Sequence, residues 1–318
     1  MKQKLISELQ PGDSVLSFFV VRKKEVREKK TNRALYLTFE FGDRSGRIRG
    51  TIWDHIQEVN QAIQVSDIVK IKGKVITFHE GSHISIEKVR KTTSKDNVEL
   101  RQFLPSTDKN IEKMYSSIMM LIDSFTNSHI QKLLYLFFKN EKFKQQFSYA
   151  PAAKLWHHNY LGGLLEHTLS VAQLCDVLQQ HYPQVNRDIL LAGALLHDIG
   201  KIAELSTQGF INYSTKGRLI GHITMSAQIV TDKIKQVKGF PDNLKNRLLH
   251  NILSHHGQKE YGSPVVPMTL EAFVLNYADE LDSKMAAFQR IMKKEKEPGK
   301  VWSNYINLLD RFIYLGEE

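Results

Sequence analysis

Residues 12–90 contain stretches in which apolar and polar side chains alternate, which is the pattern of β-strands with one buried face. In ALYLTFEF (residues 34–41) two sets of side chains alternate. One face carries the apolar set Leu35, Leu37, Phe39 and Phe41, and the other carries Tyr36, Thr38 and Glu40. In RIRGTIW (residues 47–53), Ile48 and Ile52 lie on one face, and the basic and aromatic side chains lie on the other. Both stretches are therefore predicted to be strands with one face in a core.

The order of the predicted elements indicates a small β-barrel. Three strands are followed by a short helix over residues 54–63, and two more strands follow over residues 67–78 and 83–90. We expect the charged stretch from Arg22 to Lys30 to form a solvated hairpin loop, with phosphate contact as a secondary possibility. Five strands with a helix after the third are the layout of the OB-fold, assigned here to residues 1–91.

One face of this barrel is a candidate nucleic-acid interface. If Ile48 and Ile52 point inward, Arg47, Arg49 and Trp53 point outward together. Tyr36 joins them if its apolar neighbours are in the core. Basic groups interleaved with flat rings suit phosphates and bases, although a solvated strand face with an incidental Trp would show the same pattern.

The pattern changes to a helical period after a polar linker at residues 92–106. From Thr107 onward, apolar residues recur at spacings of three and four, as in IEKMYSSIMMLIDSF. Residues 107–318 are therefore predicted to be a helical domain. The protein as a whole is expected to be a multidomain α+β protein.

Composition and charge narrow the class of protein. The net charge is +10, and residues 1–100 contain 19 Lys and Arg against 13 Asp and Glu, which favours an anionic partner. No apolar run approaches the length of a membrane helix, and we expect no membrane association and no signal peptide. The single cysteine, Cys175, excludes an internal disulfide and fits the cytoplasm.

Histidine and aspartate residues gather at the ends or on the inward faces of the predicted helices. Neutral imidazoles and carboxylates are ligands for divalent metals, and one carboxylate can bridge two ions. Two such ions can activate water and stabilise the oxygens of a phosphoryl displacement. The residues are His167, His197, Asp198, His222, His255 and Asp279.

The order of the motifs EHT, HDIGK, GH, HH and AD resembles that of the HD-domain phosphohydrolases, over about residues 150–290. The resemblance implies a first metal held by His167, His197, Asp198 and Asp279. It implies a second metal that Asp198 bridges to, held also by His222 and His255.

The same resemblance bears on the residues around these ligands. Asp198 and Lys201 are the predicted catalytic residues, and Lys201 is placed to neutralise a phosphate oxygen. His256 is interpreted either as a metal ligand or as a phosphate contact. His157 and His158 either line the substrate path or pack in a loop.

An OB-like barrel ahead of an HD domain, with LWHHNYLGGLLEHT leading in, resembles the YhaM family of bacterial 3′–5′ exoribonucleases nearly from end to end. The resemblance implies release of nucleoside monophosphates from single-stranded RNA, with some action on DNA. Manganese is the metal that it implies first, with Mg²⁺, Fe²⁺ or Co²⁺ as alternatives. The sequence leaves a homo-oligomer open.

Two other functions fit parts of the sequence. An HD phosphohydrolase acting on a small or cyclic nucleotide would use the same ligands, with the barrel as a regulatory module. A nucleic-acid-binding replication or regulatory protein with a degenerate HD domain would keep the barrel, but the intact ligand set argues against it. The basic N-terminal third favours the nuclease.

Overall fold

The computed structural model describes residues 4–29, 33–78, 81–98 and 100–316 and contains two compact units. One unit comprises residues 1–106 together with residues 206–212. The other comprises residues 107–205 and 213–318. The first is built on a β-barrel and the second on helices, so the predicted α+β fold class is confirmed.

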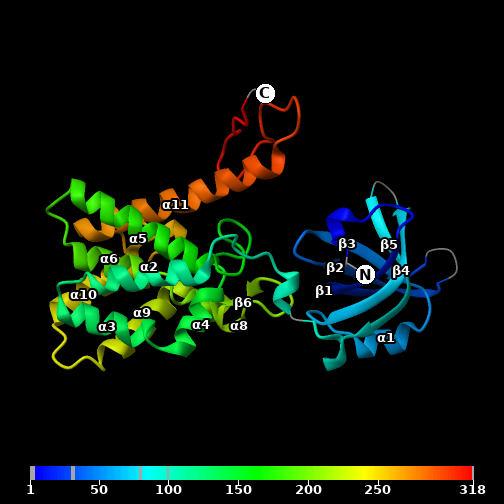
Figure 1. Ribbon diagram of the computed structural model, residues 1–318, viewed down its shortest axis with the longest axis horizontal. Coiled ribbons are helices and arrows are strands. Elements are labelled where there is room, and N and C mark those ends of the chain that lie inside the picture. The colour runs from blue at the N-terminus through cyan, green and yellow to red at the C-terminus, as the bar shows by residue number, and fades with distance from the viewer. Residues whose placement is uncertain (1–3, 30–32, 79–80, 99, 317–318) are drawn as a thin grey trace. The chain divides into compact units, whose positions relative to one another are not determined.

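The strands of the first unit close into a barrel in the order β1-β2-β3-β5-β4 (Figure 1). The pair β3–β5 is parallel, and the other neighbouring pairs are antiparallel. This is the five-stranded Greek-key layout of the OB-fold. The elements are β1 (Ser14–Glu28), β2 (Leu35–Gly42), β3 (Arg47–Ile52), α1 (Ile56–Ala62), β4 (Ile68–Phe78) and β5 (Gly81–Lys91).

The barrel interior is filled by the apolar set of each alternating strand. On β2, Leu37, Phe39 and Phe41 are buried, as the period of two predicts. A side chain at Gly73 on β4 would lie 2.3 Å from the backbone oxygen of Ser85, so glycine allows this close strand approach. The opposite face of β2 and β3 is thereby presented outside the core.

Strand β1 is longer than the sequence predicted. Residues 14–20 pair with β4, and residues 20–28 pair with β2 after a bulge between Val21 and Lys23. The predicted loop from Arg22 to Lys30 is therefore wrong for residues 22–28, which are strand. Charged side chains stand on both faces of this arm because it extends beyond the core, which hides the alternation that marks a strand.

The second unit is built of helices, and four of them start with an asparagine cap. Asn110, Asn127, Asn140 and Asn186 each accept a backbone N–H at a helix start, which stabilises the first turn. The helices are α2 (Ile111–Asp123), α3 (Ser128–Phe138), α4 (Glu141–Tyr149), α5 (Gly163–His181), α6 (Arg187–Leu196), α7 (Lys201–Glu204), α8 (Thr215–Ile220), α9 (His222–Ile234), α10 (Asp242–Ser254) and α11 (Leu270–Glu295).

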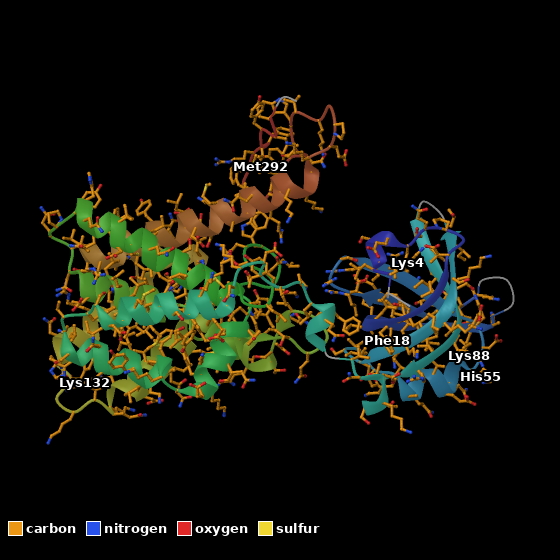
Figure 2. The ribbon with its side chains drawn as sticks, viewed as in Figure 1. Lys4, Phe18, His55, Lys88, Lys132 and Met292 are labelled. Atoms are coloured by element: carbon orange, nitrogen blue, oxygen red, sulfur yellow. The ribbon has the colours of Figure 1, made fainter. Side chains whose placement is uncertain are left out.

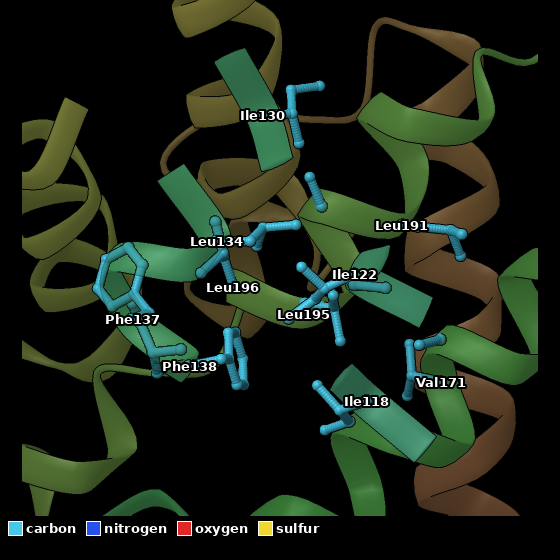
Figure 3. Close-up of a cluster of buried hydrophobic side chains, with 14 of the residues drawn as sticks. Ile118, Ile122, Ile130, Leu134, Phe137, Phe138, Val171, Leu191, Leu195 and Leu196 are labelled. Atoms are coloured by element: carbon cyan, nitrogen blue, oxygen red, sulfur yellow. The ribbon is translucent and has the colours of Figure 1, made fainter. Parts of the chain in front are cut away.

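Helix α6 lies at the centre of the helical core. Its residues from Asp188 to Leu196 are all buried, and Leu191, Leu195 and Leu196 pack in the cluster shown in Figure 3. A helix that is apolar on all sides is surrounded by other helices. The last residue of α6 is therefore held firmly, and so are the residues that follow it.

Smaller segments complete the structure. Strands β6 (Leu205–Ser206) and β7 (Asn212–Tyr213) form a two-stranded sheet. Among the described residues no helix is long and apolar enough to cross a membrane. Charged side chains such as Lys88 and Lys132 project from the two units (Figure 2).

Candidate functional site

Helix ends and inward helix faces bring six predicted ligands together in the helical unit. His197 directly follows α6, Asp198 comes next, and His255 directly follows α10. His222 is the first residue of α9. His167 lies on the buried face of α5, and Asp279 lies on that of α11. The structure thus gathers every residue that the sequence analysis assigned to the metals.

The first group of donor atoms is compact. His167 Nε2 lies 3.1 Å from Asp279 Oδ1 and 3.4 Å from Asp198 Oδ2. His197 Nε2 lies 3.3 Å from Asp198 Oδ2 and 3.9 Å from Asp279 Oδ1. Four donor atoms therefore surround one point in the interior.

The second group faces the other oxygen of the same carboxylate. His222 Nε2 lies 3.4 Å from Asp198 Oδ1, and His255 Nε2 lies 3.7 Å from it. Asp198 thus turns Oδ2 toward one set of donors and Oδ1 toward the other. This arrangement suits a carboxylate that bridges two cations.

Hydrogen bonds on the side away from the centre fix the orientation of the four imidazole rings. Each uses Nδ1 to donate a hydrogen bond, so Nε2 keeps its lone pair and faces the centre. The acceptors are Asp282 Oδ2 for His167 (2.7 Å), Ala194 O for His197 (2.8 Å), Glu204 Oε1 for His222 (3.0 Å) and Ile252 O for His255 (2.7 Å).

Several buried atoms at the centre have no hydrogen-bond partner among the residues that the structure describes. Asp198 Oδ1, His222 Nε2 and His255 Nε2 are in this position. The Nε2 atoms of His167 and His197 lie 3.3 Å apart, so in the neutral tautomers set by their Nδ1 hydrogen bonds the two rings would turn lone pairs toward each other. Unpaired buried lone pairs are costly, and a cation between them would remove that cost. The donor set therefore fits bound divalent metal.

The pKa shifts of His167 and Asp198 also indicate that the centre of the donor groups favours positive charge. Burial lowers the pKa of His167, but hydrogen bonds to Asp198, Asp279 and Asp282 outweigh it and raise the pKa well above its ordinary value. Burial raises the pKa of Asp198, but Lys201 and His197 outweigh it and hold that pKa well below its usual range. The carboxylates are thus ionised and ready to hold a cation.

Lys201 is buried next to the bridging carboxylate. Its Nζ lies 2.5 Å from Asp198 Oδ2. Burial lowers the pKa of Lys201, but the carboxylates of Asp198 and Asp279 outweigh burial and raise that pKa above its ordinary value. The ammonium is therefore charged. The lysine that the sequence assigned to a phosphate oxygen therefore forms an ion pair with Asp198 in this structure.

The remaining predicted histidines lie around the centre. The His256 ring centroid is 5.2 Å from that of His222, and its Nδ1 donates to Tyr261 O. His157 has a buried, unpartnered Nδ1, and its ring is 5.3 Å from the His167 ring. His158 is buried and hydrogen-bonds through Nε2 to Asp282 Oδ2, the same oxygen that accepts from His167 Nδ1. It therefore lies on the side of His167 away from the centre.

Two carboxylates that the sequence analysis did not select complete the site. Asp282 also accepts from Ser170 Oγ and lies 3.0 Å from His158 Nε2, and Glu204 also accepts from the backbone N–H of His222. Asp282 lies three residues after Asp279 on one helix, so helical spacing alone could have placed it on the same face. Glu204 likewise lies three residues after Lys201 on α7, so the same spacing could have pointed to it.

The barrel carries a separate hollow of about 290 Å³ on the outward face of β2 and β3. Tyr36, Arg49 and Trp53 line it, and the rings of Tyr36 and Trp53 have centroids 4.8 Å apart. Lys29 Nζ lies 4.1 Å from the centroid of the Trp53 ring. Arg47 is not among the lining residues and pairs with Glu40. Three of the four residues predicted for this interface therefore share one surface.

Residues outside the predicted set also line the hollow. His83 Nε2 lies 2.9 Å from Thr51 Oγ1, and Lys23, Glu25 and Arg27 come from the arm of β1 that was expected to be a loop. The sequence analysis assigned this stretch phosphate contact only as a secondary possibility, and the structure places three of its residues in the wall of the hollow.

Comparisons with known proteins match parts of the chain. The model of the HD domain family matches residues 164–284, which contain all six predicted ligands. A crystal structure of a domain of replication protein A from Methanococcus maripaludis aligns with 28% of this chain and 93% of its own, at 26% identity and a TM-score of 0.25.

Curated relatives match over nearly the whole length. A protein of Listeria welshimeri named 3′-5′ exoribonuclease YhaM is 31% identical over 314 residues, which cover 98% of each chain. The protein of the same name from Bacillus subtilis is 32% identical over 305 residues, which cover 95% of each. The match includes the barrel as well as the HD domain, and the chain therefore belongs to the YhaM family of 3′–5′ exoribonucleases.

Proposed function

We propose that this protein removes nucleoside monophosphates one at a time from the 3′ end of single-stranded RNA, and acts on single-stranded DNA as a second substrate. The observation that carries the proposal is the Asp198 carboxylate, which faces one donor group with each oxygen. The barrel hollow lined by Tyr36 and Trp53 supports a nucleic acid as the substrate.

We propose that two divalent ions occupy the centre, with Mn²⁺ favoured and Mg²⁺, Fe²⁺ or Co²⁺ as alternatives. His167, His197, Asp198 and Asp279 would hold one ion, and Asp198, His222 and His255 would hold the other. When bound, such ions lower the pKa of a water and act as Lewis acids toward phosphoryl oxygens.

Three of the protein's own side chains are proposed to have separate roles around the phosphodiester. Asp198 would hold both ions, since each of its oxygens faces one donor group. Lys201, which pairs with Asp198 in this structure, is placed to contact a phosphate oxygen at the centre. His157, with its unpartnered Nδ1 beside His167, is placed to contact the phosphate or sugar.

The barrel is proposed to hold the strand away from the reacting end. Bases stack on the rings of Tyr36 and Trp53, and phosphates contact Arg49 and Lys29. We further propose a cytoplasmic location, because the one cysteine, Cys175, is buried and unpaired as in proteins of a reducing compartment.

An assay with 5′-end-labelled single-stranded RNA and Mn²⁺ tests the activity. We expect stepwise shortening from the 3′ end with release of mononucleotides, and complete inhibition by EDTA. Cleavage that is confined to cyclic dinucleotides or mononucleotides would replace this proposal with a small-nucleotide phosphohydrolase. Unchanged cleavage in EDTA would remove the metal from the proposal.

Replacing Trp53 by Ala tests the barrel surface. We expect the affinity for a 20-nucleotide single strand to fall by about 1–3 kcal/mol, because a stacking base loses its partner ring. Fluorescence anisotropy with a labelled oligonucleotide measures the change. Trp302→Ala is the matched control, since Trp302 is an exposed Trp of the helical unit and is 56% exposed. Equal affinities for wild type and Trp53→Ala would mean that the strand binds elsewhere.

A further inference from the structure

One cavity of the helical unit lies beside the metal centre. It has a volume of about 310 Å³, and its lining includes His256, Gln258, Tyr261, Phe273, Tyr277 and Glu280. Apart from His256, these residues have no role in the sequence analysis or in the function proposed above. Its size falls at the lower end of the range of small-molecule sites.

The cavity adjoins the donor groups at His256 and Asn276, which both line it and contact His255. The ring centroid of His256 lies 4.4 Å from that of His255, and Asn276 Nδ2 donates to the backbone oxygen of His255 at 2.7 Å. Asn276 also lines the cavity, and Asp279 follows it by three residues on α11. One helix therefore carries a metal-facing carboxylate and, on the adjoining face, a wall of this cavity.

The walls of the cavity are aromatic and unusually exposed. Tyr261, Phe273 and Tyr277 are 64%, 55% and 54% exposed. The ring centroids of Phe273 and Tyr277 are 4.8 Å apart. Flat rings that remain open to solvent beside a catalytic centre offer stacking surfaces, and side chains such as Gln258 and Asn276 offer donors and acceptors to a ring edge.

The charge of the cavity lining favours the base of a nucleotide over its phosphate. Its lining contains no Lys or Arg and includes the carboxylate of Glu280, which pairs with Lys284. Such a wall disfavours a phosphate, whereas Lys201 and the metal donors favour one. A nucleotide bound across both places would thus put its phosphate at Asp198 and its base among the rings.

We propose that this cavity binds the base of the 3′-terminal nucleotide while its phosphodiester is at the metal centre. The inference rests on the proposed exoribonuclease function and adds a subsite to it. The stacked base positions the terminal linkage and holds the mononucleotide until release. Stacking tolerates every base, so the subsite recognises the presence of a base more than its identity.

Paired RNA substrates test the inference. One ends in a normal 3′ nucleotide, and the other ends in a 3′ abasic ribose on the same sequence. We expect wild type to remove the normal terminal nucleotide with a kcat/KM about tenfold higher. The double variant Phe273→Ala/Tyr277→Ala should lose this preference by slowing removal of the normal terminus alone.

The control is a second exposed ring pair. Tyr305 and Phe312 have ring centroids 5.1 Å apart and lie in the C-terminal segment, so Tyr305→Ala/Phe312→Ala should keep the wild-type preference. Metal content and thermal midpoint establish that each variant is folded. If the double variant on α11 is unstable, Tyr261→Ala alone should reduce the preference, because Tyr261 is exposed in a short turn.

The outcomes separate this inference from the function on which it rests. A wild-type protein that shortens neither RNA contradicts the exoribonuclease proposal. A wild-type protein that shortens both RNAs at the same first-step rate contradicts the base subsite alone. So does a double variant that retains the wild-type preference or slows both substrates equally.

Discussion

Asp198→Asn is expected to lower the rate of RNA hydrolysis by more than about 100-fold, which exceeds the effect of losing a group that only supports a ligand. The carboxylate faces both donor groups, so an amide in its place weakens the binding of both metals at once. Bound Mn²⁺, measured by elemental analysis after gel filtration, should fall together with activity. Binding of single-stranded RNA at the barrel should persist.

The amide variant is preferable to Asp198→Ala. Lys201 is buried against this carboxylate, and removing the side chain would leave an unpaired ammonium at a cost of about 3–5 kcal/mol in unfolding free energy. Asp232→Asn is a matched control, because Asp232 is exposed and pairs only with a nearby lysine on its helix. Near-wild-type turnover by Asp198→Asn would eliminate the bridging role.

Glu204→Gln and Asp282→Asn are expected to weaken different metals. Glu204 supports His222 of one donor group, whereas Asp282 supports His167 of the other. Loss of a supporting carboxylate typically costs 10–100-fold in metal affinity. Calorimetric titration with Mn²⁺ should therefore show one weakened site out of two in each variant.

Combining the two substitutions distinguishes positioning from general destabilisation. If each carboxylate acts through its own histidine, the double variant should show both sites weakened by about the single-variant amounts. Thermal midpoints close to that of Asp232→Asn would exclude loss of fold as the cause. Equal weakening of both sites by either single substitution would contradict the separate assignments.

Much of the architecture was predictable because it depends on local patterns. Alternation identified the inner face of β2 and the exposed positions of Tyr36 and Trp53, and both follow from the pleat of a strand. The six clustered His and Asp residues were predictable from their motifs, since His197 and Asp198 directly follow the buried helix α6. Their convergence at one point required the tertiary structure.

Other features depend on contacts between distant residues. The arm of β1 is charged on both sides, so its pairing with β2 leaves no apolar signal. Arg47 points away from the core as predicted, but Glu40 on the neighbouring strand engages it. Glu204 acquires its role from His222, which is 18 residues away, and no local period marks such a pair.

The anchoring of the four imidazoles by Nδ1 has a consequence for the energetics of metal uptake. Each ring has already lost its rotational freedom when the protein folds, because a backbone carbonyl or a carboxylate holds it. Metal binding then does not have to order these side chains, so more of the intrinsic ligand affinity is available as binding free energy. The centre is in this sense a rigid receptor for ions, whose selectivity is set by the fixed spacing of its nitrogens and oxygens.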